Sequence, residues 1–317
     1  MKILVTGGAG FIGSNFIIYM MGKYPDYKIV NLDKLTYAGN LENLKSVEND
    51  PRYTFICGDI CDKKIVQKAM AGCDMVVHFA AESHVDRSIT GPAIFIQTNV
   101  IGTEILLETA LELGIKRFHH ISTDEVFGTL SLLNLSEKFN ENTPYSPRSP
   151  YAASKASSDH LVRAFIETYN FPATISNCTN NYGPFQFPEK IIPLFITNAF
   201  ENKPLPIYGQ GQAVRDYLYV VDHCMAIDLI LHKGKIGETY CIGGDSEKNG
   251  LEIADTILDL LDKPKNLKTF VTDRKGHDMR YAMDHSKITN ELGWKPSVDF
   301  TEGINKTIEW YKSKWKK

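Results

Sequence analysis

The sequence has few cysteines, little net charge and no continuous apolar run near the ~20 residues of a bilayer-spanning helix. Its six cysteines form no Cys-x-x-Cys pair, so we expect reduced, mostly buried thiols rather than disulfides or a metal site. The net charge of −3 argues against a nucleic-acid partner. The apolar stretch at residues 3–5 is too short for a signal peptide. We therefore expect a cytoplasmic protein that does not span a membrane.

The composition is ordinary for a soluble α/β protein. The 317 residues are 43% hydrophobic and 23% charged, enough for one large domain or two modest ones. The N-terminal half alternates strand-like and helix-like stretches, which predicts a Rossmann-type doubly wound parallel sheet. We predict that residues 1–178 form this domain and that residues 217–243 return to it. Residues 179–216 and 244–317 should form a smaller mixed α/β C-terminal domain for a substrate.

A glycine-rich loop follows the first predicted strand, at residues 2–6. Gly7, Gly10 and Gly13 form a G-x-x-G-x-x-G pattern, and a helix is expected from about Ser14. Such glycines permit a tight turn and let the backbone approach a pyrophosphate, while the helix N-terminus presents free amides to that anion. Glycine-rich turns are common, but here the strand before and the helix after are both predicted. The loop therefore indicates a dinucleotide site.

Asp33 indicates which dinucleotide is bound. It ends the second predicted strand, at residues 28–32, and lies 20 residues after Gly13. A carboxylate at this spacing binds the adenosine ribose diol. Because its charge would repel a 2′-phosphate, we predict NAD rather than NADP.

Further strands are expected at residues 53–57, 75–81 and 118–122, and ligands in such sheets bind at the carboxyl ends of strands. Asp59 follows the first of these strands and is placed to reach the adenine. Ala80-Ala81 ends the second and is expected to lie over the cofactor.

The third strand runs directly into Thr123-Asp124-Glu125, and a helix expected at residues 150–169 carries Tyr151 and Lys155. This tyrosine and lysine lie one helical turn apart, so they share a face. Such a pair can take a proton from an alcohol during hydride transfer. The Asp-Glu pair adds an acid and a base, which oxidation alone does not need. Two acids after a strand can also simply cap a helix. The Asp-Glu pair together with the Tyr-Lys pair, however, predicts an oxidation that makes a neighbouring bond easier to break.

A helix expected at residues 91–113 is apolar on most of its circumference, with Gly114 after its end. A helix apolar all round must be buried on both sides. A homodimer contact made by this helix and the helix at residues 150–169 explains the pattern, and so does burial in the core.

These motifs carry a family resemblance. The glycine loop, the Tyr-x-x-x-Lys pair and residues 181–184 (Asn-Tyr-Gly-Pro) resemble the extended short-chain dehydrogenases/reductases. A narrower set resembles the dTDP-glucose 4,6-dehydratases of that family, nearly from end to end. It consists of residues 80–88 (AAESHVDRS), 122–128 (STDEVFG), 187–190 (FPEK) and 276–278 (GHD).

The resemblance implies a reaction. NAD takes a hydride from C4 of dTDP-glucose while Tyr151 removes the hydroxyl proton, with its pKa lowered by Lys155 and the positive nicotinamide. Glu125 then removes the C5 proton, and Asp124 protonates the C6 hydroxyl, which leaves as water. Hydride returns to C6, giving dTDP-4-keto-6-deoxyglucose. Thr123 holds the sugar near O4. The commonest use of this product is L-rhamnose for a cell-surface polysaccharide.

Binding residues are implied as well, and no metal is among them. The cofactor contacts expected from the loop, the strand ends and the resemblance are Gly7, Gly10, Phe11, Ile12, Gly13, Asp33, Lys34, Asp59, Ile60, Ala80, Ala81, Thr98, Tyr151, Lys155 and Asn181. The expected substrate contacts are Ser83, Thr123, Asn180, Glu189, Lys190, Arg215 and His277. Arg215 is expected to neutralise the diphosphate.

Four positions depart from the family pattern. Asn177 stands where Arg is usual, Lys275 where Pro is usual, Met279 where Arg is usual, and Gly250 where Asn is expected. We expect none of them to touch the catalytic residues. The last three are expected near the nucleotide, where they bear on affinity and base preference.

Two other functions fit parts of the pattern. A nucleotide-sugar epimerase or decarboxylase of the same fold also uses the tyrosine and NAD, but related epimerases usually lack the Asp-Glu pair. A non-enzymatic NAD-binding sensor is disfavoured because Tyr151, Lys155, Asp124 and Glu125 are all present.

Overall fold

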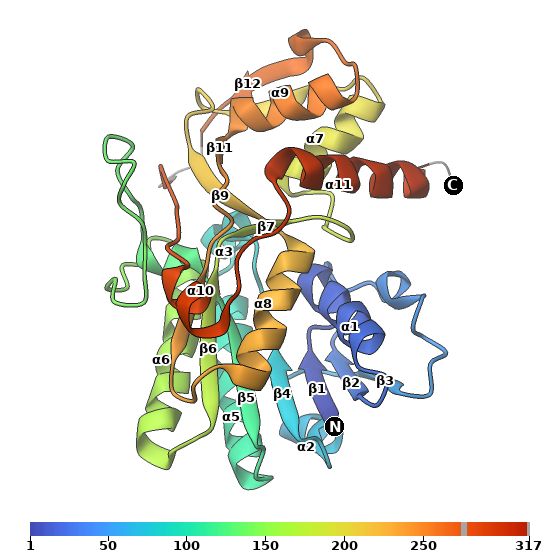
Figure 1. Cartoon of the computed structure of the whole chain (residues 1–317), viewed down its shortest axis with the longest axis vertical. Coiled ribbons are helices and arrows are strands. Elements are labelled where there is room, and N and C mark those ends of the chain that lie inside the picture. The colour runs from blue at the N-terminus through green and yellow to red at the C-terminus, as the bar shows by residue number, and fades with distance from the viewer. Residues whose placement is uncertain (274–277, 316–317) are drawn as a thin grey trace.

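A seven-stranded sheet in which all neighbours are parallel forms the centre of the larger part of the molecule (Figure 1). The computed structural model describes residues 1–273 and 278–315. The spatial order is β10-β6-β5-β4-β1-β2-β3. The strands are β1 (Lys2–Thr6), β2 (Lys28–Asp33), β3 (Tyr53–Cys57), β4 (Met75–His78), β5 (Arg117–Thr123), β6 (Ala173–Cys178) and β10 (Thr239–Ile242).

Helices cover both faces of this sheet, because the central strands are apolar on both sides. Along β1, Ile3 and Val5 face α1 (Phe11–Lys23) and α8 (Val220–Lys233), whereas Leu4 faces the opposite core. That opposite core is covered by α2 (Lys63–Met70), α5 (Gly102–Glu112) and α6 (Pro150–Tyr169). The predicted Rossmann-type doubly wound sheet is confirmed.

Most predicted elements are present, with corrected ends. Strands 2–6 and 53–57 and helix 150–169 have the predicted bounds. Helix α1 begins at Phe11, three residues before the predicted start. Strand β4 ends at His78, so Ala80 and Ala81 follow the strand rather than ending it.

The helix predicted at residues 91–113 is present as one continuous helical segment, Ala93–Glu112, but its ends and its uniform α-helical type are corrected. The segment contains α4 (Ala93–Phe95), the π-helix η2 (Ile96–Ile101) and α5, and it is preceded by the short helix α3 (Val85–Thr90). The wide π-helical turn carries Asn99, which is buried. Asn99 accepts a hydrogen bond from the Glu82 backbone amide at 2.8 Å and donates to the Ser154 hydroxyl at 2.8 Å. These polar contacts, invisible in the apolar pattern, accompany the change of helix type.

By length and composition alone, the helical segment Ala93–Glu112 is apolar enough to cross a membrane. The segment is not a continuous apolar run, because it carries Gln97, Asn99 and Glu104 among its apolar residues. In the structure, η2 and α5 pack against α6, and α5 packs against α2. The apolar side chains that this region nevertheless exposes include Ile94, Ile96, Ile101, Leu111 and Leu113.

A second, smaller group of elements lies beyond the carboxyl ends of the large sheet, at the top of Figure 1. Its sheets pair β7 (Asn180–Tyr182) with β9 (Val214–Tyr219) and β11 (Glu247–Asn249), and β8 (Leu205–Tyr208) with β12 (Lys268–Val271). Its helices are α7 (Ile191–Phe200), α9 (Gly250–Leu260) and α11 (Phe300–Trp315). Their apolar faces form a separate core. Helix α10 (Ser286–Leu292) instead contacts β10 and α8.

Candidate active site

A cavity of about 520 Å³ opens at the carboxyl ends of the large sheet. It is lined by every residue predicted to bind the cofactor, from the glycine loop to Asn181. Gly7 has φ +71°, and a Cβ atom there would lie 2.6 Å from the Ala80 amide nitrogen. A Cβ on Gly13 would lie 2.4 Å from the Gly7 carbonyl oxygen. The loop therefore packs against the residues that follow β4 and against the start of α1 only because these positions are glycines, which suits close backbone approach to a pyrophosphate.

Two carboxylates, Asp33 and Asp59, line the part of this cavity where the adenosine is expected. Asp33 accepts hydrogen bonds from the backbone amides of Ala9, at 2.9 Å, and Leu35, at 2.8 Å. Burial raises the pKa of Asp33, and these two hydrogen bonds partly oppose that rise. Lys34 and Asp59 form an ion pair of 2.6 Å at the same cavity. This donor and acceptor set fits a ribose diol and an adenine.

The Asp-Glu pair lies where the sheet ends. Thr123 is the last residue of β5, and its hydroxyl accepts a hydrogen bond from the Glu125 amide, capping the 3-10 helix η3 (Asp124–Phe127). Asp124 is 2% exposed and accepts from the hydroxyls of Thr123, at 3.1 Å, and Thr179, at 3.2 Å. Burial, and then the charge of Glu125, raise the pKa of Asp124 from its usual 3.8 to about 7. Asp124 can therefore hold a proton near neutral pH.

Tyr151 and Lys155 lie beside this pair on α6, whose first turn is capped by the Ser149 hydroxyl. Burial, and then the charge of Glu125, raise the pKa of Tyr151 well above its usual 10, although its hydrogen bond with Thr123 lowers it. The protein groups thus raise this pKa, whereas the prediction of a lowered pKa combined Lys155 with the charge of the nicotinamide. Burial is the main cause of the rise and the Glu125 carboxylate is the next, while the Lys155 ammonium donates to the Ile121 carbonyl at 2.8 Å.

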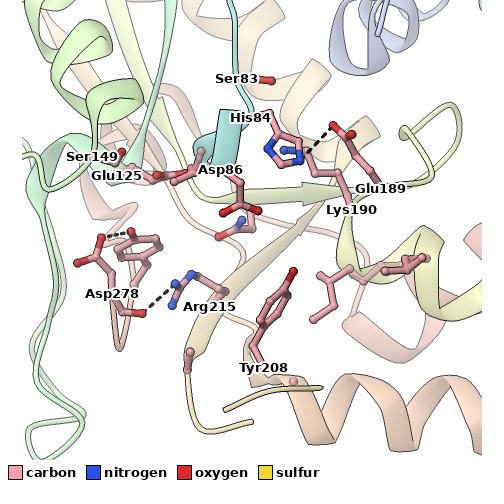
Figure 2. Close-up of a pocket in the computed structure, with 18 of the residues that line it drawn as sticks. Ser83, His84, Asp86, Glu125, Ser149, Glu189, Lys190, Tyr208, Arg215 and Asp278 are labelled. Atoms are coloured by element: carbon pink, nitrogen blue, oxygen red, sulfur yellow. Dashed lines mark hydrogen bonds and ion pairs between the residues drawn. The ribbon is translucent and has the colours of Figure 1, made fainter. Parts of the chain in front are cut away.

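A second cavity, of about 540 Å³, adjoins the first and faces the smaller group of elements (Figure 2). Its lining includes the predicted substrate residues Ser83, Asn180, Glu189, Lys190 and Arg215. Thr123 lines the cofactor cavity instead, and His277 lies outside the described residues. Both cavities share several lining residues, namely Ser83, Glu125, Asn180, Asn181, Gln186, Glu189 and Lys190. Glu125 therefore lies at the boundary between the two.

Arg215 is held in place at the second cavity. Its guanidinium donates to the Asp278 carbonyl at 2.9 Å (Figure 2). The guanidinium also lies 4.1 Å from the centre of the Tyr281 ring. Asp278 also forms an ion pair of 2.9 Å with Arg148. Sequence reasoning missed Arg148, although its position three residues before Tyr151 was the available signal.

A bridge of side chains from three segments crosses between the cavities. The Arg87 guanidinium lies 3.7 Å from the centre of the Tyr37 ring and 3.3 Å from the Glu189 carboxylate. His84 also approaches Glu189, at 3.5 Å (Figure 2). Tyr37 follows β2 and lines the cofactor cavity, whereas Glu189 precedes α7 and lines both. No local sequence signal pointed to this bridge.

One departure from the family pattern lies closer to the catalytic residues than expected. The Asn177 side-chain amide donates to the Thr123 backbone carbonyl at 3.1 Å, so the expectation that no departure touches this set is wrong. Gly250 lines the second cavity, as expected for a position near the nucleotide. Met279 donates its backbone amide to the Thr129 hydroxyl. Lys275 lies outside the described residues.

Known proteins have sequences and folds similar to those of this chain. The family model for GDP-mannose 4,6 dehydratase matches residues 4–307. The dTDP-glucose 4,6-dehydratase of Salmonella typhimurium is 54% identical, covering 98% of this chain and 92% of that protein. The enzyme of that name from Haemophilus influenzae is 51% identical, covering 98% of both.

Solved structures agree. The dTDP-glucose 4,6-dehydratase of Streptomyces venezuelae, determined with NAD bound, superimposes with a TM-score of 0.95 at 48% identity, covering 99% of this chain and 97% of that one. A UDP-glucose 4-epimerase from Thermotoga maritima gives 0.90 at 29% identity, covering 99% and 100%. The fold and the site thus define an extended short-chain dehydrogenase/reductase that acts on nucleotide sugars. Within that class, the chain belongs to the dTDP-glucose 4,6-dehydratase family.

Proposed function

We propose that this chain is a hydro-lyase that uses NAD to convert dTDP-glucose into dTDP-4-keto-6-deoxyglucose. The family relationship supports the substrate and the cofactor. The adjoining cavities supply one space for the dinucleotide and one for the nucleotide sugar. When bound, NAD accepts a hydride from C4 of the glucose and later returns it to C6.

The residues of the chain move the protons. Tyr151 takes the proton of the C4 hydroxyl, which Thr123 holds in register by a hydrogen bond near O4. Lys155 supplies the positive charge beside the tyrosine. Once C4 is a ketone, the C5 proton is acidic and Glu125 removes it. Asp124 gives its proton to the C6 hydroxyl, which leaves as water.

The observation that carries this proposal is the contrast between two adjacent carboxyl groups. Asp124 is buried, and its raised pKa keeps a proton available near pH 7. Glu125 lies at the boundary of both cavities, where a base must face the sugar. Neighbouring groups with environments this different suit an acid and a base in one elimination.

The substrate is held by charge at its diphosphate. Arg215 presents its guanidinium to the second cavity, and planar guanidinium groups bind phosphates in bidentate fashion. Lys190, Asn180, Ser83 and Glu189 complete the binding set. His277 is proposed to join them.

The domain division and the location belong to the same proposal. Residues 1–178 and 217–243 bind NAD, and residues 179–216 and 244–317 bind the nucleotide sugar. Cytoplasmic location is supported by the six cysteines, all free thiols, of which three are buried, two partly buried and one exposed. The product is proposed to feed L-rhamnose synthesis for a cell-surface polysaccharide.

We also propose a homodimer. The apolar side chains exposed by α4, η2 and α5 form the proposed contact together with α6, whose Tyr169 is also exposed. Burying these side chains in a contact would stabilise the dimer by roughly 25 cal/mol of free energy for each Å² of apolar surface removed from water. Ile96, in η2, is 47% exposed and belongs to this surface.

Incubation with dTDP-glucose tests the reaction. The expected product has lost the mass of one water and absorbs in alkali as a 4-keto sugar. UDP-glucose in a parallel reaction tests the alternative, because an epimerase changes the configuration at C4 with no change in mass. A product of unchanged mass from dTDP-glucose would overturn the proposed function. Tyr151→Phe is the control for background chemistry.

A further inference from the structure

A buried carboxylate that the proposed reaction does not use lies behind Lys155. Asp159 is 0% exposed and follows Lys155 by one turn of α6. One of its oxygens accepts hydrogen bonds from the hydroxyls of Ser122, at 2.7 Å, and Tyr145, at 2.8 Å. The other lies 3.1 Å from Nε2 of His120. Buried carboxylates are rare unless they are paired, so Asp159 needs a cation to balance it.

His120 connects Asp159 to Lys155. Its Nε2 lies 3.3 Å from the Lys155 ammonium, and its other nitrogen, Nδ1, is buried with no hydrogen-bond partner among the described residues. Burial, and then the charge of Lys155, lower the pKa of His120 to about 4. The imidazole is therefore neutral at the pH of the reaction, and its Nε2 lies between the Lys155 ammonium and the Asp159 carboxylate. The centre of this network then holds one cation and one anion, Lys155 and Asp159.

An ammonium group buried this deeply loses the hydration that stabilises its charge. That loss is unfavourable unless an opposite charge compensates it. Lys155 is 5% exposed, and burial lowers its pKa while the charge of Asp159 raises it. The Lys155 ammonium also donates to the Ile121 carbonyl, which orients it but supplies no full charge.

We propose that Asp159 is a positioning residue that keeps Lys155 protonated, acting on Tyr151 through the lysine rather than touching the substrate. The inference rests on the proposed roles of Tyr151 and Lys155. A merely structural alternative exists, because Asp159 also ties α6 to β5 and to the segment that carries Tyr145. The two roles differ in the pH dependence that they predict.

Other ionisable groups face this network from the elements packed against it. The Arg163 guanidinium donates to the Tyr145 hydroxyl at 2.9 Å, at the end of the network remote from Lys155. The His78 ring lies 5.2 Å from the His120 ring, centre to centre, and burial lowers the pKa of His78 well below its usual value. The titratable or charged groups to consider are His78 of β4, His120 of β5, Tyr145 of the loop before α6, Tyr151 and Arg163 of α6, and Cys178 of β6.

The test uses Asp159→Asn, which keeps the shape of the side chain and removes its charge. Single-turnover formation of the NADH absorbance band, measured against pH, reports the first oxidation. Because an opposite charge at close range raises the pKa of a cation by roughly 1–3 units, the pH above which this step declines should fall by about one unit or more. The Lys155 amine is also titrated directly, by NMR of protein labelled at the lysine ε-carbon and assigned with Lys155→Met. Its pKa should fall by the same amount.

Three variants act as controls. Tyr145→Phe removes a hydrogen bond from Asp159 but keeps the charge, so the profile should not move. Asp159→Glu keeps the charge and should restore the profile even if the rate falls. Glu167→Gln removes an exposed charge from the same helix and should change neither readout.

The outcomes separate the two roles. If Asp159→Asn lowers the rate or the melting temperature but leaves the profile and the Lys155 titration unchanged, Asp159 is structural and the proposal is overturned. It is also overturned if Asp159→Asn and Asp159→Ser both fail to fold while Tyr145→Phe folds. If the parent protein makes no 4-keto product, the proposed function fails, but the NMR titration still decides the role of Asp159.

Discussion

Asp124→Asn should make the protein more stable, by an amount that grows with pH. In the folded protein, burial and the charge of Glu125 raise the pKa of Asp124 to about 7, against 3.8 in an exposed chain. At a pH below both pKa values, the carboxyl group is protonated in the folded and in the unfolded protein, so it does not lower the free energy of unfolding. As pH rises, the unfolded chain releases this proton more readily than the folded protein. The folded state is therefore progressively penalised up to about pH 7.

The size of this penalty follows from the shift. One pKa unit corresponds to about 1.36 kcal/mol, so a shift of about three units costs the folded state roughly 4 kcal/mol above pH 7. At pH 5.5 the penalty is roughly 2 kcal/mol by the same relation. Asparagine carries no charge, but it weakens one of the hydrogen bonds from Thr123 and Thr179, at a cost of about 1 kcal/mol. The net gain should be about 3 kcal/mol at pH 8 and about 1 kcal/mol at pH 5.5.

Calorimetric melting temperatures of the parent and Asp124→Asn, each at pH 5.5 and pH 8, measure this difference. At roughly 2 °C for each kcal/mol, the advantage of the variant should be about 4 °C larger at pH 8. The histidines are the same in both proteins, so their contribution to the pH dependence cancels in the difference between the two melting temperatures. Glu125→Gln is the matched control, because removing the neighbouring charge should reduce the pH dependence of the parent. An advantage that is equal at both pH values would show that Asp124 titrates normally and would refute the reasoning.

Other predictions concern the reaction and the assembly. Asp124→Asn and Glu125→Gln should lose 4-keto-6-deoxy product by roughly 10²–10⁴-fold yet still reduce bound NAD with dTDP-glucose; failure of both to form NADH would reassign them to binding or to the first step. Tyr151→Phe should bind NAD but form no NADH, and a rate within about tenfold of the parent would exclude Tyr151 as the base. Stripped protein should bind NAD more tightly than NADP, and Asp33→Ala should reduce that preference; tighter NADP binding by the parent contradicts the role of Asp33. Light scattering should show a dimer that Ile96→Glu dissociates, whereas a monomeric parent at micromolar concentration contradicts the proposed surface.

The parts of the site that were predictable depend on short stretches of sequence. The glycine loop needs only its own turn and the next helix, so Gly7 and Gly13 identified the cofactor cavity. Helix α6 has its signals at its own start, where Ser149 caps it and Pro150 occupies its first turn. Asp124 and Glu125 were located because a parallel strand must end at the ligand-binding edge.

The parts that were missed depend on contacts between distant segments. Asn177 reaches Thr123 because β5 and β6 pair with Ser122 opposite Asn177, a register that neither strand reveals alone. The contact of Arg87 with Tyr37 and Glu189 joins three segments, and the local sequence of each indicates only an ordinary loop or helix. The raised pKa of Tyr151 likewise depends first on its burial in the fold and then on the nearby Glu125, and not on the spacing of Tyr151 and Lys155.

The position of β10 at one edge of the large sheet has a consequence for how the chain folds as it is synthesised. Strand β10 pairs with β6, yet β7, α7, β8, β9 and α8 intervene between them in the sequence. A nascent chain that has emerged only to Cys178 holds six of the seven strands and leaves β6 as an open edge. Exposed parallel edges are templates for pairing with other chains. The sheet is complete only after Ile242 has left the ribosome, so chains terminated before that residue should be recovered mainly as aggregates.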